Sequence, residues 1–319
     1  MATFSDVFRI VRLHCPLAPL HLVRFWTQEA YRQVCDRRPW SWLRSENEFL
    51  ITAQKTAGTV TVTNNSAAVV GVGTAFAASD VGRQFRSGTS GPVYSIATHT
   101  NATNITIDRV YGGTTAAGAS YSILDAYVTM PADFLRFISV LDTSNNWQLH
   151  LWITEAELNA WDAQRSSTGT PWALVNRRRS SLAATVGRAQ YELWPYQTSA
   201  KGYPYYYIRN PESLADTDTL QDPLNSRSDI LVMGAIAQCA GWPGLEGRKN
   251  PYFNPTLAAS KQREFSANVD RMEVLDEETY LTWMETTNFQ RWPFAPIDAQ
   301  YLQSHDVLSL AYGYGGFYG

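Results

Sequence analysis

Residues 58–76 read GTVTVTNNSAAVVGVGTAF, and this stretch decides how the middle of the chain folds. Thr59 to Thr63 alternate threonine with valine, which is the period of a half-buried β-strand. Asn64, Asn65 and Ser66 then supply turn residues before a second run rich in valine. The stretch therefore predicts short strands separated by tight turns.

The same composition extends from about residue 56 to residue 127. This segment holds twelve threonines, nine of the twenty glycines and six charged residues, whereas all eleven tryptophans lie outside it. Residues 104–108 again alternate with period two. We predict an all-β sandwich or barrel of six or seven short strands. Because residues 49–53 and 127–130 resemble two strands of one hairpin, we expect this β-domain to be inserted at a hairpin tip.

The remainder of the chain predicts helices with some strands. An amphipathic helix follows Pro19, with apolar residues at spacings of three and four. Thr154 and Glu157 form a capping box that opens a short helix. Residues 230–240 are almost wholly apolar, as in a buried helix, and a longer helix is expected from Pro255 to about Glu285. The predicted fold class is α+β: a helical host domain with antiparallel hairpins (residues 1–55 and 128–290), the inserted β-domain (56–127) and an extended C-terminal tail (291–319).

Composition restricts the possible functions. Charged residues make up 17% of the chain and the net charge is -3, which argues against a general nucleic-acid binder. The N-terminal residues do not resemble a signal peptide, and no stretch approaches the roughly 20 apolar residues of a membrane span. Cys15, Cys35 and Cys239 are odd in number and far apart, which predicts free thiols in a protein made in a reducing cytoplasm.

No motif predicts an enzyme, a cofactor or a metal. The five histidines share no ligand spacing, and residues 71–76 (GVGTAF) lack the third glycine of a dinucleotide fingerprint. One loop contains four acidic residues: Glu212, Asp216, Asp218 and Asp222. They are compatible with a divalent-ion site or a hydrolase site. The simpler interpretation is an acidic surface loop whose aspartates cap turns.

Two further stretches indicate contact surfaces. One is a run of three arginines, Arg177, Arg178 and Arg179. Such a run is compatible with binding a phosphate, with binding the carboxylates of a partner, or with an unremarkable solvated surface. Residues 191–214 carry six tyrosines, which suit a sugar site, a nucleic-acid platform, a core or a protein contact. Residues 197–202 (QTSAKG) predict a turn between two strands of a hairpin, with Tyr205 and Tyr207 on one face and Tyr206 on the other. Aromatic residues on both faces favour burial against the protein's own helices and a neighbouring subunit.

Several motifs outside the β-domain follow one another in an order that resembles the head-to-tail adaptor (connector) proteins of tailed bacteriophages. They are a strand leading to Met130–Phe134 (MPADF), a Gly-x-Pro segment at 169–171, an aromatic-Pro strand at 193–195, YYIRNPESL at 206–214 and an apolar helix with Gly234 and Ala235. The resemblance spans roughly residues 19–54 and 128–285. Residues 59–86 also resemble a small β-module of phage structural proteins.

The resemblance implies a structural protein of the virion neck that is made in the host cytoplasm and is not an enzyme. It implies a dodecameric ring that docks on the portal, extends the DNA channel and offers a platform to tail nozzle, tube or fibre proteins. DNA would pass through the lumen without specific binding, and no membrane is involved. A virion-associated glycan hydrolase and a carbohydrate-binding tail protein are the alternatives. The expected subunit or partner contacts are Arg177, Arg178, Arg179, Tyr205, Tyr206, Tyr207, Asp216, Asp218, Tyr312, Tyr314, Phe317 and Tyr318.

Overall fold

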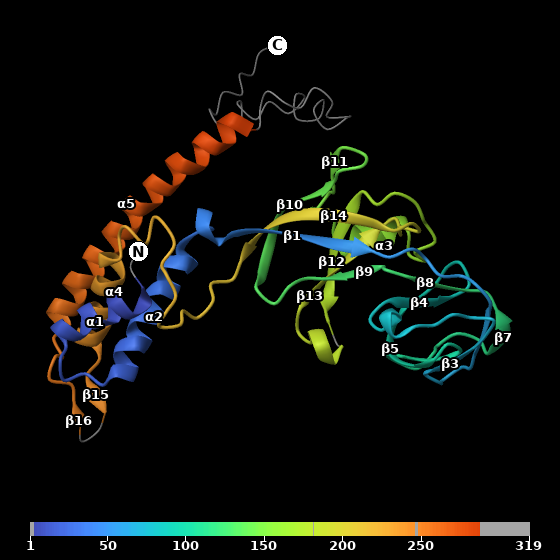
Figure 1. Cartoon of the computed structure of the whole chain (residues 1–319), viewed down its shortest axis with the longest axis horizontal. Coiled ribbons are helices and arrows are strands. Elements are labelled where there is room, and N and C mark those ends of the chain that lie inside the picture. The colour runs from blue at the N-terminus through green and yellow to red at the C-terminus, as the bar shows by residue number, and fades with distance from the viewer. Residues whose placement is uncertain (1–2, 181, 246–247, 288–319) are drawn as a thin grey trace, which may run out of the picture. The chain divides into compact units, whose positions relative to one another are not determined.

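The computed structural model describes residues 3–180, 182–245 and 248–287 (Figure 1). The chain divides into two compact units. The helical unit is formed by Met1–Trp42 with Ser213–Gly319, and the β unit by Leu43–Glu212. Helices and antiparallel sheets together make the protein mixed α+β, as the sequence predicts. The host strands, however, cluster with residues 56–127 in the β unit and not with the long helices.

The helical unit contains α1 (Phe4–His14), α2 (Leu20–Arg37), α4 (Asp229–Gly241) and α5 (Pro255–Thr287), with the short hairpin β15 (Gly244–Leu245) and β16 (Arg248–Lys249). Helix α2 follows Pro19 and buries Val23, Trp26, Ala30 and Val34, which confirms the predicted apolar stripe. Helix α4 is apolar on nearly every side and packs against α1, α2 and α5. The 3₁₀ turn Ser41–Leu43 lies at the division between the units.

Helix α1 was not anticipated from the sequence, although its signals are present. Thr3 accepts a hydrogen bond from the backbone N–H of Asp6, and the Asp6 carboxylate accepts one from the N–H of Thr3. This reciprocal capping box opens a helix whose buried residues recur at helical spacing. They are Phe4, Val7, Phe8 and Val11.

One part of the β unit consists of two facing sheets. One has the order β1 (Arg44–Ile51), β14 (Lys201–Arg209), β10 (Phe134–Asp142) and β11 (Trp147–Gln148). The other has the order β12 (Ala173–Arg179), β13 (Ala189–Trp194) and β9 (Tyr127–Thr129). Both sheets contribute to one buried cluster, which includes Phe49, Leu174, Leu193, Tyr203 and Tyr205.

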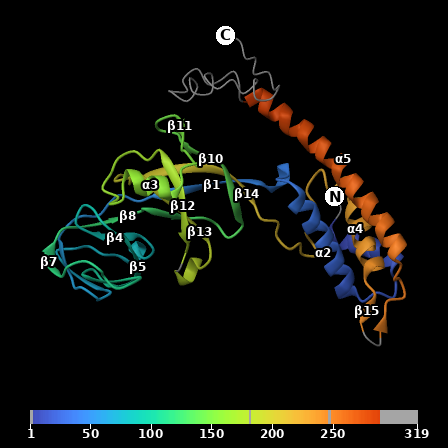
Figure 2. The ribbon, with the colours of Figure 1, turned by 180° about the vertical axis from the view of Figure 1, so that it is seen from behind.

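The other part of the β unit is a seven-stranded antiparallel sheet that curls around its own core (Figures 1 and 2). Its strand order is β7 (Ala116–Ala119), β2 (Thr59–Val62), β3 (Ala68–Val72), β6 (Asn104–Ile107), β5 (Tyr94–Asn101), β4 (Gln84–Ser87) and β8 (Tyr121–Leu124). Seven strands agree with the predicted six or seven. They form one curled half-barrel sheet. Two 3₁₀ turns, Ala78–Asp80 and Ala183–Thr185, complete the unit.

The chain enters and leaves this sheet at one place. The N–H and C=O of Lys55 bond the C=O and N–H of Ile123, both at 2.9 Å. The buried Arg83 guanidinium donates to the Asp125 carboxylate at 2.8 Å and to the Ala53 carbonyl at 2.9 Å. A backbone bridge and a buried ion pair therefore hold the two ends of the segment together.

Both predicted hairpins are wrong. Residues 49–51 pair with β14 and residues 127–129 pair with β13, so the two segments lie in different sheets. Likewise β13 pairs with β12 and β9, whereas β14 pairs with β1 and β10. The physical reason is a shared core: Leu193 of β13 and Tyr203 of β14 enter the same buried cluster from opposite sheets. Residues 195–200 therefore cross between sheets and do not form a hairpin turn.

Candidate interaction surfaces and the network beneath them

A contiguous group of indole rings lies around α3 (Glu155–Trp161). Trp152 precedes this helix and Trp161 is its last residue, and they expose 67% and 54% of their surface. The Trp161 ring centroid lies 6.1 Å from that of Trp172, which lies 5.0 Å from that of Trp194. His150 connects Trp152 and Trp172 with centroid distances of 5.5 and 5.6 Å. We call these five residues the tryptophan patch.

Local sequence holds α3 under the patch. Thr154 and Glu157 form the predicted capping box, since the Thr154 N–H donates to the Glu157 carboxylate at 2.7 Å. Ile153 and Leu158 are buried against Ala173 and Val175 of β12. The apolar side of α3 is therefore fixed to the sheet, and Trp152 and Trp161 remain at the surface.

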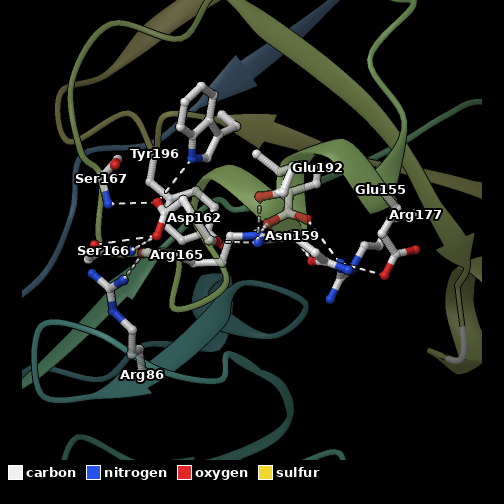
Figure 3. A network of polar contacts seen from close by, with 12 residues as sticks. Arg86, Glu155, Asn159, Asp162, Arg165, Ser166, Ser167, Arg177, Glu192 and Tyr196 are labelled. Atoms are coloured by element: carbon white, nitrogen blue, oxygen red, sulfur yellow. Dashed lines mark hydrogen bonds and ion pairs between the residues drawn. The ribbon is translucent and has the colours of Figure 1, made fainter.

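A buried polar network lies beneath the patch (Figure 3). Arg165 is 6% exposed, and its guanidinium donates through Nε to Glu192 Oε1 at 2.7 Å. The same guanidinium donates to the Asn159 side chain at 2.5 Å and to the Asp162 carbonyl. Glu192 is fully buried, and it also accepts a hydrogen bond from the Tyr196 hydroxyl at 2.9 Å. Burial and the neighbouring Glu192 charge raise the pKa of Tyr196, so its hydroxyl stays a donor.

Asp162 organises the loop after α3. Its carboxylate accepts hydrogen bonds from the N–H groups of Ser166 and Ser167, at 2.9 and 3.0 Å, and from the Trp194 indole at 3.1 Å. Burial alone would raise the pKa of Asp162, but these donors outweigh it and hold the pKa well below its usual range. Asp162 thereby links the loop to a ring of the tryptophan patch.

The stability of the β unit is expected to depend on Asp162 in acid. Because the folded state lowers the pKa of Asp162, its stabilising contribution is complete above the unfolded pKa of about 3.9 and is lost as the pH falls below it. Urea unfolding of Asp162→Asn should therefore show a weaker loss of unfolding free energy between about pH 5 and about pH 2 than wild type. Parallel pH curves for the two proteins would contradict this role.

Arg86 joins the curled sheet to the same network. It extends from β4, is almost fully buried and donates to the Arg165 carbonyl at 2.7 Å (Figure 3). Its guanidinium carbon lies 5.7 Å from the centre of the Tyr196 ring. A small apolar cluster also combines residues from both parts of the β unit. It consists of Val93, Leu124, Ala126 and Tyr196. The curled sheet and the facing sheets thus share apolar and polar contacts.

The arginine run is bound largely within its own chain. Arg177 lies 2.7 Å from the Glu155 carboxylate and 3.4 Å from that of Glu192. Arg178 donates to the Gln190 and Ser95 side chains, at 3.1 and 2.9 Å. Arg179 is exposed and makes a 3.5 Å hydrogen bond to the Gly187 carbonyl. All three arginines thus have partners within the described chain, only Arg179 of the three is exposed, and contact with another subunit stays a prediction.

The tyrosines of β14 alternate as predicted. Tyr205 and Tyr207 are buried in the core between the facing sheets, and burial raises the pKa of Tyr205 to about 12. Tyr206 points to the other face and is 40% exposed. The aromatic concentration is therefore mainly core, and only Tyr206 of these three offers surface.

The acidic loop makes its contacts with helices of its own unit and within itself. Asp216 forms an ion pair with Arg24 of α2, and its carbonyl accepts the Ser5 N–H at 3.1 Å. The Asp218 carboxylate accepts the Ala215 N–H at 2.7 Å, as in a capped turn. No group of three His, Cys, Asp or Glu side chains within residues 3–180, 182–245 and 248–287 is arranged to hold a metal ion. Tyr312, Tyr314, Phe317 and Tyr318, like the predicted tail, lie outside the described residues.

The helical unit carries an apolar groove of about 710 Å³ between α1, α4 and the start of α5. Ile10, Ile236, Phe253 and Leu257 line it, and Cys15 and Cys239 also face it. Ile10, Phe253 and Leu257 are exposed. We call this surface the helix groove. None of the helices in the described part of the chain has the length and apolar character to cross a membrane.

Neither the tryptophan patch nor the helix groove was predicted from the sequence. The available signal was a capping-box helix with Trp152 before it and Trp161 at its C-terminal end, which leaves large indoles next to charged surface positions. The rings of Trp172 and Trp194 come from other strands, so their meeting depends on sheet pairing.

Comparison with curated proteins found no match. A protein-family model described as SU10 adaptor protein matches residues 96–289, which is more than half of the chain. The match begins in β5, within the segment predicted as an insertion, and continues through α3, α4, α5 and every strand of the facing sheets except β1. The chain therefore belongs to the SU10 adaptor family of bacteriophage structural proteins.

Proposed function

We propose that the protein is a head-to-tail adaptor of the virion neck that forms a dodecameric ring, docks on the portal, extends the DNA channel and provides a platform for the tail. Membership of an adaptor family supports a structural role in joining phage head and tail components. The tryptophan patch is the observation that carries the more specific assignment. Exposed indoles on a rigid base are typical of residues that dominate protein interfaces.

A closed ring of identical subunits needs two different surfaces, because one patch of each copy binds another patch of the next. The chain offers two such surfaces, the tryptophan patch on the β unit and the helix groove on the helical unit. The patch presents indole rings, whereas the groove is lined by aliphatic side chains of three helices and by aromatic side chains that precede α5. The two surfaces are therefore unlike, as a head-to-tail contact between copies requires.

The lumen is proposed to pass DNA without specific binding. The net charge of -3 supplies no general excess of cations. Arg177 and Arg178 bind groups of their own chain, which leaves Arg179 as the exposed member of the run. The curled sheet of residues 59–124 is proposed to act as an inserted module that contacts a tail fibre or nozzle, and residues 291–319 to contact the portal or a neighbouring subunit.

Removing the exposed indoles is expected to impair assembly and not folding. In Trp152→Ala/Trp161→Ala, each changed side chain is more than half exposed, so the melting temperature should change by only a few degrees. Each buried interface tryptophan contributes on the order of 2 kcal/mol, so ring formation on the portal should weaken by at least about thirtyfold. Sedimentation velocity of the protein mixed with its phage's portal measures this.

Val186→Ala is the matched control, because Val186 is 68% exposed on the same unit but lies outside the patch. It should assemble as wild type does. Unimpaired assembly of the double variant would exclude the patch as a subunit contact, whereas absence of any wild-type complex with portal would reject the adaptor proposal itself.

A further inference from the structure

Two cysteine side chains meet at the helix groove. Cys15 caps the C-terminus of α1, and Cys239 lies in the last turn of α4. Their Sγ atoms are 3.0 Å apart although the residues are 224 positions apart in the chain. Both side chains are buried, and both line the groove. The position of each thiol in the sequence gives no indication of this pairing.

The backbone fixes both cysteines in place. The Cys15 N–H donates to the Val11 carbonyl at 3.0 Å, and the Asn250 side chain donates to the Cys239 carbonyl at 2.7 Å. A disulfide bond is about 2.05 Å long, so the sulfurs need to approach by roughly 1 Å.

We propose that Cys15 and Cys239 form an oxidation site at which a small peroxide creates a disulfide between α1 and α4. The groove gives a small solute access to the sulfurs, and the third cysteine, Cys35, lies on α2 and does not line this groove. This inference does not depend on the proposed ring or on portal docking.

The two thiols have different roles in the reaction. The hydrogen bond from the Cys239 thiol lowers the pKa of Cys15, and the same bond together with burial raises the pKa of Cys239. The Cys15 thiolate is therefore the nucleophile, because thiolates and not thiols attack oxidants. It attacks one peroxide oxygen, the O–O bond breaks, and the released hydroxide takes up the proton that Cys15 lost. Cys15 becomes a sulfenic acid.

The second step closes the bond. Cys239 transfers its proton to the hydroxyl group of the sulfenic acid, and its thiolate sulfur attacks the sulfenic sulfur; the S–S bond forms as the S–O bond breaks and water leaves. Two thiols are oxidised to one disulfide, and one peroxide is reduced to two waters. The bond closes a long loop of the chain, which constrains the unfolded state strongly. In a reducing cytoplasm the pair would stay as thiols, and oxidising surroundings would lock α1 to α4.

The test is peroxide treatment of the full-length protein followed by peptide mapping without reductant. We expect the mass of two hydrogen atoms to be lost and one new linked peptide that joins Cys15 to Cys239. Dithiothreitol should reverse the link, and the oxidised protein should melt several degrees above the reduced one. Cys35→Ser should behave as wild type, whereas Cys239→Ser and Cys15→Ser should show neither the link nor the increase in melting temperature.

The wild-type peptide map does not depend on whether a variant folds. Accumulation of a Cys15 sulfinic acid without a link would overturn the proposal. So would a disulfide through Cys35, or thiols that stay unchanged under peroxide while the protein remains folded.

Discussion

Replacing Glu192 with alanine is expected to lower the free energy of unfolding of the β unit by about 3–5 kcal/mol. Glu192 is fully buried and accepts hydrogen bonds from the Arg165 guanidinium and the Tyr196 hydroxyl. Its removal leaves a buried cation without its carboxylate, and an uncompensated buried charge costs far more than a surface pair gains. Urea unfolding followed by tryptophan fluorescence measures the effect, because Trp194 contacts the same network through Asp162.

Two variants separate the buried charge from simpler explanations. Glu155→Ala removes the other carboxylate near Arg177, but the Glu155 side chain is 43% exposed, so the loss should stay below about 1 kcal/mol. Glu192→Gln keeps an oxygen acceptor and removes the charge, so its stability should fall between that of Glu192→Ala and wild type. A Glu192→Ala protein as stable as the Glu155→Ala protein would show that the network does not hold the unit together.

Replacing Gly234 with alanine is expected to destabilise the helical unit by about 1–3 kcal/mol. Gly234 lies in the middle of α4, and a Cβ atom there would lie 2.8 Å from the Ala30 Cβ and 2.9 Å from the Phe265 ring. Helices α2 and α5 therefore approach α4 more closely than a methyl group permits. This clash opposes the gain of about 1 kcal/mol that alanine normally brings to a helix.

Gly241→Ala is the matched control on the same helix. A Cβ atom at Gly241 would lie 3.6 Å from the Ala258 Cβ, which is an ordinary contact. The control should therefore match wild type or exceed its stability slightly, as thermal unfolding followed by circular dichroism would show. A stabilising effect of Gly234→Ala would contradict the close packing of α2 and α5 on α4.

The sequence predicted local features well. The apolar stripe of α2, the Thr154–Glu157 capping box, the apolar helix α4 and the alternation of Tyr205, Tyr206 and Tyr207 were all expected from short-range patterns. Each depends on residues within a few positions of one another. The strand composition of residues 56–127 likewise predicted six or seven short strands, and seven form.

Long-range pairing could not be predicted from the same patterns. The strands that contain Leu193 and Tyr203 are close in sequence, so a hairpin is the simplest pairing to predict, but a common core places them in opposite sheets. The prediction for Arg177 depends on its neighbours in sequence. Its ionic partners, however, lie on other elements: Glu155 on α3 and Glu192 on β13. The tryptophan patch was missed for the same reason.

These results change the interpretation of the exposed surface. The tyrosines of β14 largely stabilise the core, and Asp216 and Asp218 stabilise the helical unit. The tryptophan patch and the helix groove are therefore the surfaces to which we assign assembly. The acidic loop binds its own helices, so the structure adds no support to a glycan hydrolase.

The most direct test of the proposed adaptor role is negative-stain electron microscopy of the purified protein mixed with the portal of its phage. We expect a ring of this protein on one end of the portal, coaxial with the portal channel, and a loss of that ring in Trp152→Ala/Trp161→Ala. Portal particles without an added ring, in the presence of excess folded wild-type protein, would contradict it.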